Sequence, residues 1–429
     1  MQTIPWQRHL PLRYDADVAV IGGGIAGVCA ACAAAREGAA VVLVERFAVT
    51  GGNATTGGVA NWSGETRGQG AIFDEIIADQ QAFNAVAPYP GPYEHFNNRR
   101  VFDHELLAVI LQEMLLRYGV KLLLHTRFVD VRVDGNTVTE AVVCGQSGPE
   151  ALRARVFIDC TGEAQVAHQA GFECASGRDQ DGLQLPPSLM YFVRELPAGA
   201  SPQLPAGRLA PVTRREDLPM TSPWPNGPQA KALKVKVVGH DNTDTEGMTA
   251  LEIQARRRML EVLDYFQRVE HKPWHLDHAA AIVGLREGRR VVGDYVLTVD
   301  DLRAGRAFDD AIARGVFILD GMTPDDEKRT YLLSKEERKV PPYQIPWRSL
   351  LARDGDNLLM AGRCLSADQL ALSSARVMTT CAMMGQAAGI GAAMAVHGAA
   401  TPRDLDGLDV RRAVEAHGAV LALAPGRPA

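Results

Sequence analysis

Residues 17–46 read DVAVIGGGIAGVCAACAAAREGAAVVLVER, and this stretch decides the class of fold. It opens with an apolar run at 17–21, passes through a glycine-rich turn at 22–27, and returns to an apolar run at 40–44. The residues between, 28–37, are rich in alanine and have helical character. Strands that are apolar on both faces are typical of parallel sheets, so the stretch predicts a strand, a helix and a second, parallel strand.

Three glycines of the turn have the spacing of a dinucleotide-binding site. Gly22, Gly24 and Gly27 form the pattern G-x-G-x-x-G. The first glycine permits a tight turn, the second lets a diphosphate approach the backbone, and the third lets the helix pack against the strand. Amide groups at the start of the helix then face the diphosphate. Glu45 ends the second strand, where a carboxylate can accept hydrogen bonds from a ribose hydroxyl.

The composition is that of an ordinary globular protein. The 429 residues are 46% hydrophobic and 22% charged, and 45 basic against 51 acidic side chains give a net charge of −6. This excludes a mainly disordered or fibrous chain and offers no basic surface for nucleic acid or an anionic membrane. The length allows about two or three domains.

The cysteines and the apolar runs indicate a cytoplasmic protein. Seven cysteines, an odd number, are scattered along the chain, as expected for reduced thiols. They form no metal-type cluster with histidine, so we expect no metal site. The uncharged run at 18–35 resembles a membrane span, but Asp15 and Asp17 precede it and three glycines interrupt it. We therefore expect no targeting or transmembrane segment and no membrane partner.

Three later stretches favour FAD over NAD as the main cofactor. A glycine pair followed by asparagine at 51–53 suits a loop that wraps a long cofactor. The stretch at 159–162 ends a predicted strand with glycine, beside the nucleotide, and the stretch at 357–363 has the form of a strand that reaches the middle of a flavin cofactor. A simple NAD dehydrogenase does not need these distant elements.

Changes in amino-acid composition along the chain indicate domain boundaries. Proline is dense between 186 and 228, which argues for extended, irregular structure. Small residues and glycines return from 345 onward. We expect a discontinuous first domain of residues 1–185 and 345–429, and an inserted domain of residues 186–344. A helix with Asp103 as its N-cap is also predicted in the first domain.

Together these motifs resemble the FAD-dependent oxidoreductase family, a group of glutathione-reductase-type flavoproteins distantly related to succinate dehydrogenase and fumarate reductase flavoprotein subunits. The matching motifs are GGGIAG at 22–27, ER at 45–46, GGNATTGG at 51–58, REGRRVVGDYVLT at 286–298, NLLMAGRCLS at 357–366 and SARVMTTC at 374–381. The resemblance implies an α/β fold: a Rossmann-like FAD-binding domain of the glutathione-reductase type with an inserted α+β substrate domain. It also implies an active site between the two domains.

The resemblance extends to the residues that hold FAD. The predicted cofactor-binding residues are Gly22, Gly24, Ala26, Gly27, Glu45, Arg46, Gly52, Asn53, Thr56, Gly57, Val129, Gly162, Gly362, Arg363 and Thr379. The helix that begins near Thr379 is expected to point its N-terminus at the negative charge of the reduced flavin. Disulfide reductases of this fold carry a cysteine pair after the glycine loop, and covalent flavoproteins carry a histidine before it. This chain has neither, so we expect noncovalent FAD and no disulfide reductase activity.

Candidates on the substrate side are Arg376, Arg286 and His240. Arg376 precedes the last helix and can pair with a substrate carboxylate, although a structural ion pair is an equal alternative. Arg286 lies among further arginines in the inserted domain. His240 follows an apolar strand beside Asp241 and can act as a general base near neutral pH, although histidines in such positions are more often structural.

These observations predict an FAD-dependent oxidoreductase, a dehydrogenase or an oxidase. It takes a hydride from a small polar molecule such as a hydroxy acid, a sugar-like alcohol or an amine, and an electron acceptor reoxidises the flavin. Two alternatives stay open: reduction of an activated double bond, as in the fumarate reductase relatives, and a protein that binds FAD without catalysis. A homo-oligomer is compatible with the sequence.

Overall fold

The computed structural model describes residues 4–423, except residues 6, 89–99, 200, 202, 203, 205 and 206. Its centre is a seven-stranded sheet in the order β6-β2-β1-β9-β8-β7, in which β18 also pairs with β9. The strands are β1 (Leu12–Ile21), β2 (Val41–Val44), β6 (Lys121–Leu123), β7 (Arg127–Asp134), β8 (Thr137–Gly145), β9 (Gly148–Asp159) and β18 (Leu358–Met360). Pairings among β6, β2, β1, β9 and β18 are parallel, whereas β7, β8 and β9 pair antiparallel.

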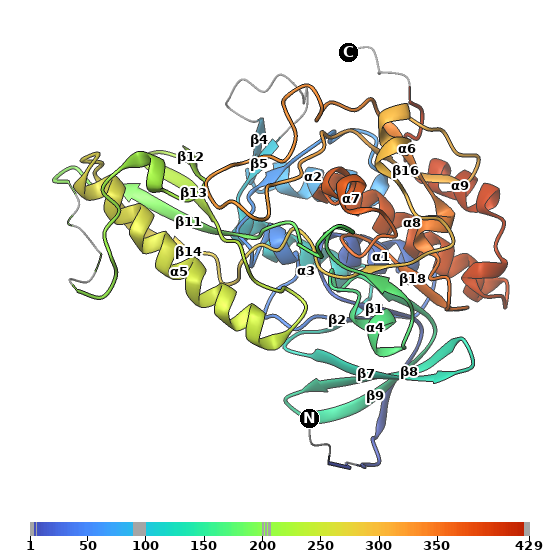
Figure 1. The fold of residues 1–429 in the computed structure, drawn as a ribbon. Coiled ribbons are helices and arrows are strands. Elements are labelled where there is room, and N and C mark those ends of the chain that lie inside the picture. Colours follow the sequence, from blue (N-terminus) through green and yellow to red (C-terminus); the bar gives the residue numbers. More distant parts are fainter. Residues whose placement is uncertain are drawn as a thin grey trace.

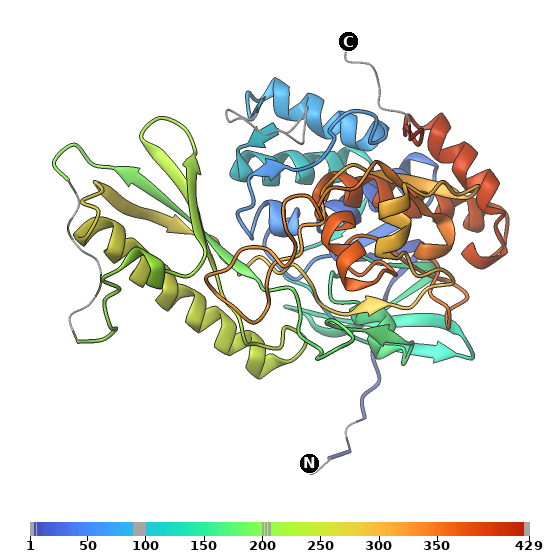
Figure 2. The ribbon, with the colours of Figure 1, turned by 45° about the horizontal axis from the view of Figure 1, so that its top comes forward.

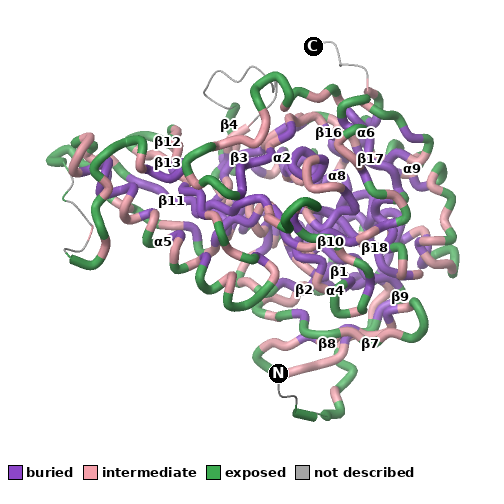
Figure 3. Tube along the Cα trace, viewed as in Figure 1, coloured by how far each residue is buried: buried purple, intermediate pink, exposed green. Residues whose placement is uncertain are grey.

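Both faces of the sheet are buried, which explains the continuous apolar runs. Val18 and Val20 of β1 belong to the hydrophobic core on one face, and Ala19 and Ile21 belong to the core on the other. The buried trace follows the centre of the body, whereas much of the β7–β8 hairpin is exposed or half-buried (Figure 3). The predicted α/β fold with a parallel, Rossmann-like core is confirmed.

Two helices cross in unusually close contact on one face of the sheet. They are α1 (Ile25–Arg36), which follows the glycine turn, and α8 (Met378–His397), which lies near the end of the chain. A Cβ on Gly385 would lie 2.1 Å from the carbonyl oxygen of Ala26. Glycine at this position therefore allows the two backbones to touch. Within the described residues, α8 is the one helix long and apolar enough to cross a membrane, and 94% of its apolar window is buried inside the protein.

A second, smaller sheet stands beside the body as a lobe (Figures 1 and 2). Its strands run antiparallel in the order β12-β13-β11-β14 and carry α5 (Thr245–Arg268) on one face. The strands are β11 (Ser188–Glu195), β12 (Thr221–Pro225), β13 (Ala230–Lys236) and β14 (Trp274–Ala279). Together with the loop up to residue 285 they enclose a separate hydrophobic core. We call residues 188–285 the cap.

The buried apolar side chains of residues 297–319 and 343–345 belong to the first hydrophobic core and not to the core of the cap. The expected inserted domain of 186–344 stays a prediction, but these contacts favour an earlier end, near 285. Leu297, Phe308 and Tyr343 illustrate the reason, since each is buried beside the helices of the body.

The remaining elements complete the body. The helices are α2 (Ala71–Ala82), α3 (His104–Arg117), α4 (Gln165–Gln169), α6 (Val299–Ala304), α7 (Gln369–Ala375) and α9 (Gly407–Ala416). The short strands are β3 (Asn61–Trp62), β4 (Val86–Pro88), β5 (Arg100–Phe102), β10 (Cys174–Ala175), β15 (Arg290–Val291), β16 (Ala311–Gly315) and β17 (Tyr343–Pro346). Asp103 is the N-cap of α3, as predicted, and its carboxylate accepts from the amides of Glu105 and Leu106.

Candidate functional site

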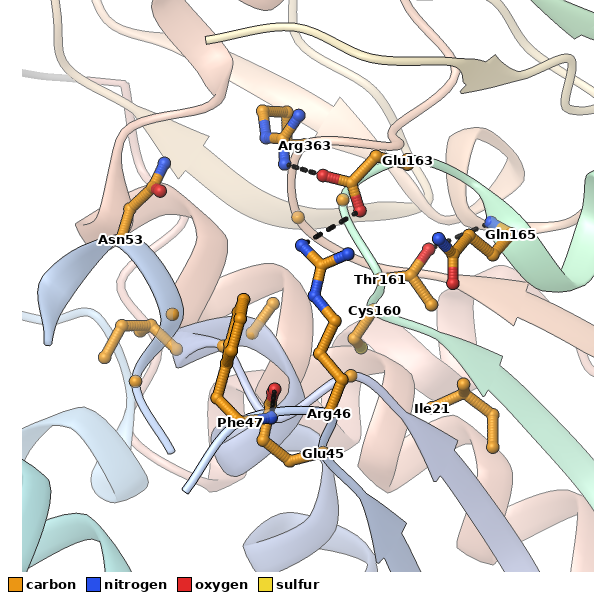
Figure 4. A pocket seen from close by; sticks show the side chains of 18 of the residues that line it. Ile21, Glu45, Arg46, Phe47, Asn53, Cys160, Thr161, Glu163, Gln165 and Arg363 are labelled. Carbon is orange, nitrogen blue, oxygen red and sulfur yellow. Dashed lines mark hydrogen bonds and ion pairs between the residues drawn. The ribbon is translucent and has the colours of Figure 1, made fainter. Parts of the chain in front are cut away.

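A cleft of about 1030 Å³, its open mouth included, lies at the carboxyl ends of the parallel strands. Ligands in α/β folds bind at this edge of the sheet. Stretches that are distant in the sequence line it together: 21–26, 44–47, 51–53, 126–128, 160–165, 361–363 and 376–381. Ile282 and Leu285 of the cap complete the wall. The glycine turn, the asparagine-bearing loop and the start of α8 thus meet around one cavity. Figure 4 shows Asn53, Cys160 and Arg363 around it.

The glycine turn has the geometry that its sequence requires. Gly22 has a positive φ of 102°, and a Cβ on Gly27 would lie 1.8 Å from the carbonyl oxygen of Gly22. A Cβ on Gly24, by contrast, would meet no protein atom within 4 Å. Gly24 lines the cleft, so the space beside it is open to a ligand.

Glu45 closes the turn from the neighbouring strand. Its Oε2 accepts a hydrogen bond from the Gly23 amide at 2.7 Å, and its Oε1 accepts from the Phe47 amide at 2.9 Å. The side chain is buried, and burial raises the pKa of its carboxyl group. These contacts hold Glu45 in the wall of the cleft.

Glu163 links two arginines across the cleft, as the dashed lines of Figure 4 show. Its carboxylate lies 2.7 Å from Arg363 Nη2 and 3.9 Å from Arg46 Nη2. The Arg46 guanidinium also lies over the Phe47 ring, 4.7 Å from its centroid. Arg363 Nη1 is buried without a hydrogen-bond partner among the described residues, so this arginine keeps a donor for a ligand. Sequence reasoning missed Glu163, although it directly follows the stretch 159–162.

Asp159 shapes the loop that carries Glu163. Its carboxylate accepts from the amides of Thr161, Val166 and Ala167 and from the Thr161 hydroxyl, at 2.8–3.2 Å. Burial raises its pKa, and the hydrogen bonds act in the opposite direction. Asp159 therefore organises the loop at 160–165 without facing the cleft.

The N-terminus of α8 opens onto the cleft. Met378 and Cys381 line the cavity, and Val377 caps the helix without a side-chain hydrogen bond. The first amides of a helix lack partners within the helix and carry partial positive charge, which favours an anionic group there. Thr379 itself does not line the cavity, because its hydroxyl donates to the Ser63 carbonyl oxygen at 2.7 Å.

Arg376 lies where the cleft meets the cap. It pairs with Asp320 at 2.9 Å, and its Nε is buried without a partner in the described part of the chain. Arg286 donates only to neutral oxygens of Pro186 and Ser188, at 2.7 and 2.8 Å. Burial and the like charge of Arg376 lower the pKa of Arg286 to about 10. The ion pair expected as an alternative for Arg376 is present, yet Arg376 also lines the cavity.

The structure brings together most of the predicted residues. Those that line the cleft are Gly22, Gly24, Ala26, Glu45, Arg46, Gly52, Asn53, Gly162, Gly362, Arg363 and Arg376. Two of the predicted residues that do not line it shape the asparagine-bearing loop instead. Thr56 donates its hydroxyl hydrogen to the Gly52 carbonyl oxygen, and Gly57 lies against Asn53.

Val129 and His240 lie away from the cavity. Val129 is 46% exposed, and its neighbours 126–128 face the cleft in its place. His240 contacts Gln254 at 2.5 Å and lines a different surface cleft. Gly27 and Arg286 also lie outside the lining residues. Within the described residues no group of three or more His, Cys, Asp or Glu side chains has the arrangement of a metal site.

The cleft fits a dinucleotide that carries a flavin. It has open space at Gly24 for a diphosphate, and the first turn of α8 contributes Met378 and Cys381 to its lining. Buried donors without partners on Arg363 and Arg376 match a ligand with many acceptor oxygens. Asn53 donates from its side-chain amide to the Leu285 carbonyl oxygen at 3.0 Å and ties the loop to the cap.

Comparison with known proteins agrees with this geometry. The family described as FAD dependent oxidoreductase matches residues 17–414. The chain belongs to this family. FAD is the family's cofactor, and the fold of the cleft is the one that binds it.

Relatives of known function match only part of the chain. Thiamine thiazole synthase from Pyrococcus horikoshii is 26% identical over 172 residues, which is 38% of this chain and 64% of that protein. The chain therefore spans less than two thirds of the length of the curated relatives it matches.

Solved structures share the fold. CabE, an aromatic hydroxylase from angucycline biosynthesis, has a TM-score of 0.50 and 16% identity, over 94% of this chain and 68% of that one. A geranylgeranyl bacteriochlorophyll reductase-like protein from Thermoplasma acidophilum has a TM-score of 0.50 and 12% identity, over 94% and 83%. At these identities the likeness concerns the fold alone.

Proposed function

We propose that this protein is a dehydrogenase or oxidase that takes a hydride from a small anionic organic substrate, of the hydroxy-acid class, to noncovalent FAD. Bound FAD supplies the hydride acceptor. The observation that carries the proposal is a pair of arginines at the cleft: Arg376 lines it, and Arg286 lies beside Arg376, just outside the lining residues. Arg376 and Arg286 contribute two positive charges, and of the two only Arg376 has a carboxylate partner, Asp320.

The electrostatics of this pair favour a carboxylate substrate. Buried like charges repel, and the lowered pKa of Arg286 reflects both its burial and the charge of Arg376. An anion placed between them would relieve this repulsion and form charge-assisted hydrogen bonds. A cationic amine would meet repulsion instead. Of the three substrate classes that the sequence suggests, the hydroxy acid fits these charges.

The remaining walls suit a dry reaction site. Ile282, Leu285 and Met378 present apolar surface to the cavity, and such surface favours a site with little water. The N-terminus of α8 provides fixed positive potential next to them, on the order of 0.3–1 kcal/mol for a negative charge near a helix end.

Noncovalent attachment is supported by the chemistry of the lining residues. Cys160 and Cys381 face the cleft, but burial raises the pKa of both thiols, in Cys381 to about 12. A protonated thiol is a poor nucleophile at neutral pH. Denaturation with acid should therefore release all of the yellow cofactor into the supernatant.

The test is an anaerobic screen of donors that follows bleaching of the flavin absorption. Hydroxy acids are compared with the matching amides and alcohols, which lack the negative charge. We expect reduction by one or more hydroxy acids, followed by reoxidation with oxygen, a quinone or a dye. Preference for the neutral analogues would contradict the proposal. Double-bond substrates that oxidise reduced flavin would favour the reductase alternative, and a spectral shift without reduction would favour a binding protein.

The arginines are tested with the donor that the screen identifies. Arg376→Met and Arg286→Met should each retain FAD and lower kcat/KM on the order of 10²-fold, ~3 kcal/mol, because a charge-assisted contact to the substrate is lost. Arg194→Met is a matched control, since Arg194 is 69% exposed and pairs with Asp277 on the cap surface. Unchanged kcat/KM in both cleft variants would show that the arginines do not hold the substrate.

A further inference from the structure

Lys236, at the end of β13, is a fully buried lysine with no assigned role. Its ammonium group donates to the carbonyl oxygens of Thr323 at 3.1 Å, Arg329 at 2.5 Å and Asp326. A lysine ammonium has three donors, so these three acceptors use all of them. Burial lowers its pKa to about 8, which leaves the ammonium form dominant at neutral pH. A buried charge is tolerated only with such compensation.

The three carbonyl groups belong to one hairpin, residues 320–332, which we call the clamp hairpin. Its arms pair through the Leu332 amide and the Gly321 carbonyl oxygen at 3.0 Å, and through Thr323 and Thr330 at 3.3 Å. At the tip, the Asp326 carboxylate accepts from the amides at 328 and 329 and fixes the turn. The turn thereby aims three carbonyl oxygens at one point, where Lys236 lies.

The tip of the clamp hairpin is bound to the cap. Arg258 of α5 pairs with Glu327 at 3.0 Å, and the Met220 amide donates to the Glu327 carbonyl oxygen at 2.7 Å. Lys328 pairs with Asp217 at 3.0 Å. These ion pairs are partly exposed and so contribute little each. The buried Lys236 contact is the one that water cannot replace.

The base of the clamp hairpin reaches the cleft. Asp320 holds Arg376 through its carboxylate at 2.9 Å and through its backbone oxygen at 3.2 Å. The hairpin crosses between the body and the cap as part of the orange segment of Figure 1. A contact inside the cap is therefore connected, along the arm of the hairpin from Asp326 to Asp320, to an arginine that lines the cleft.

We propose that Lys236 is a positioning residue: through the clamp hairpin it holds Asp320 against Arg376 and so sets the orientation of the substrate-facing guanidinium. The role of Arg376 in this inference rests on the proposed function, whereas the clamp itself does not. Loss of the ammonium removes the donor that three carbonyl groups share, of which that of Thr323 is buried, and the tip then separates from the cap.

Hydrogen–deuterium exchange of the FAD-loaded protein tests the clamp without any substrate. In Lys236→Met, which keeps the length of the side chain and removes the charge, amides at 321–332 should exchange about tenfold faster, while α8 and β1 stay unchanged. Lys231→Met is the matched control, because Lys231 lies on the same strand, is partly exposed and pairs with Glu195 at 3.7 Å. It should exchange like the wild type.

Asp326→Asn provides a second variant should Lys236→Met fail to fold. Asp326 is exposed, and its change weakens the turn from outside the core. We expect faster exchange at 321–332 here too, about threefold. If the amides at 321–332 of the folded variants exchange at the wild-type rate, the proposal that Lys236 holds the clamp hairpin is overturned.

The link to Arg376 has a kinetic test. With a donor from the screen above, Lys236→Met should raise KM more than it lowers kcat, because binding of the anionic group is disturbed while the flavin is not. Equal KM values would overturn the positioning role. If no organic donor reduces the flavin while the amides at 321–332 exchange faster, the proposed function is contradicted. The role of Lys236 in holding the clamp hairpin is then still supported.

Discussion

At the scale of single residues, the three glycines of the turn differ in what an added Cβ would meet. Gly22 and Gly27 are glycine because backbone atoms lie where a Cβ would be. Gly24 differs, since no protein atom stands within 4 Å of that position. The fold requires glycine at the first two positions, whereas Gly24 leaves open space in the cleft.

This difference predicts opposite outcomes for two substitutions. Gly24→Val should fold normally and lose FAD, because the new side chain occupies the space of the diphosphate. Gly27→Ala should fail to fold, because its Cβ would lie 1.8 Å from a backbone oxygen. The ratio of flavin to protein absorption measures the first effect, and thermal unfolding of the apoprotein measures the second. Stoichiometric FAD in folded Gly24→Val would show that the diphosphate lies elsewhere.

At the scale of elements, α1 and α8 form one rigid unit beneath the cleft. Gly385 and Gly389 of α8 lie directly on the carbonyl oxygens of Ala26 and Ala30 in α1. This contact places the N-terminus of α8 at the same cleft as the glycine turn that precedes α1. The small side chains of both helices allow this close packing.

Gly385→Ala should therefore destabilise the protein by at least about 3 kcal/mol, since overpacking forces two backbones apart. Chemical denaturation measures the effect as a lower transition midpoint with an unchanged slope. Gly398→Ala, at the end of the same helix, is the control, because its nearest neighbour lies at 3.2 Å. Similar midpoints for both variants would mean that α1 and α8 are less closely packed than described.

At the scale of the whole molecule, the body and the cap meet in a stack of rings. His104 of α3 stacks on Phe192 of β11 at 5.0 Å between centroids, and Phe192 stacks on His278 of β14 at 4.4 Å. Phe192 and His278 are partners on adjacent strands of the cap. Burial, with a smaller effect from the charge of His278, lowers the pKa of His104.

This ring stack should stabilise the folded protein less in acid. The unfolded chain binds a proton at His104 near its ordinary pKa of 6.5, before the folded protein does, so stability falls as pH drops below that value. The free energy of unfolding of the wild type should decrease between about pH 7 and about pH 5.5 more than that of His104→Phe, which keeps the stack without titrating. If the free energy of unfolding changes equally with pH in the two proteins, the effect does not come from His104.

The sequence by itself determined the features that depend only on neighbouring residues in the chain. The glycine spacing, the strand–helix–strand order and the Asp103 cap depend on neighbours in the chain, and each is present in the structure. FAD as the cofactor also followed from motifs, because the glycine turn predicts a dinucleotide and the stretches at 51–53, 159–162 and 357–363 favour FAD over NAD.

Only the tertiary structure decided which distant side chains meet. Glu163 binds Arg46 and Arg363 because β2, β9 and β18 end at the same edge of one sheet, and strand order is not written in any single segment. His240 faces another surface because the turn after β13 leads its side chain away from the cleft. Contacts between segments far apart in sequence depend on the whole packing of the chain, and so do the charges that meet at Arg376.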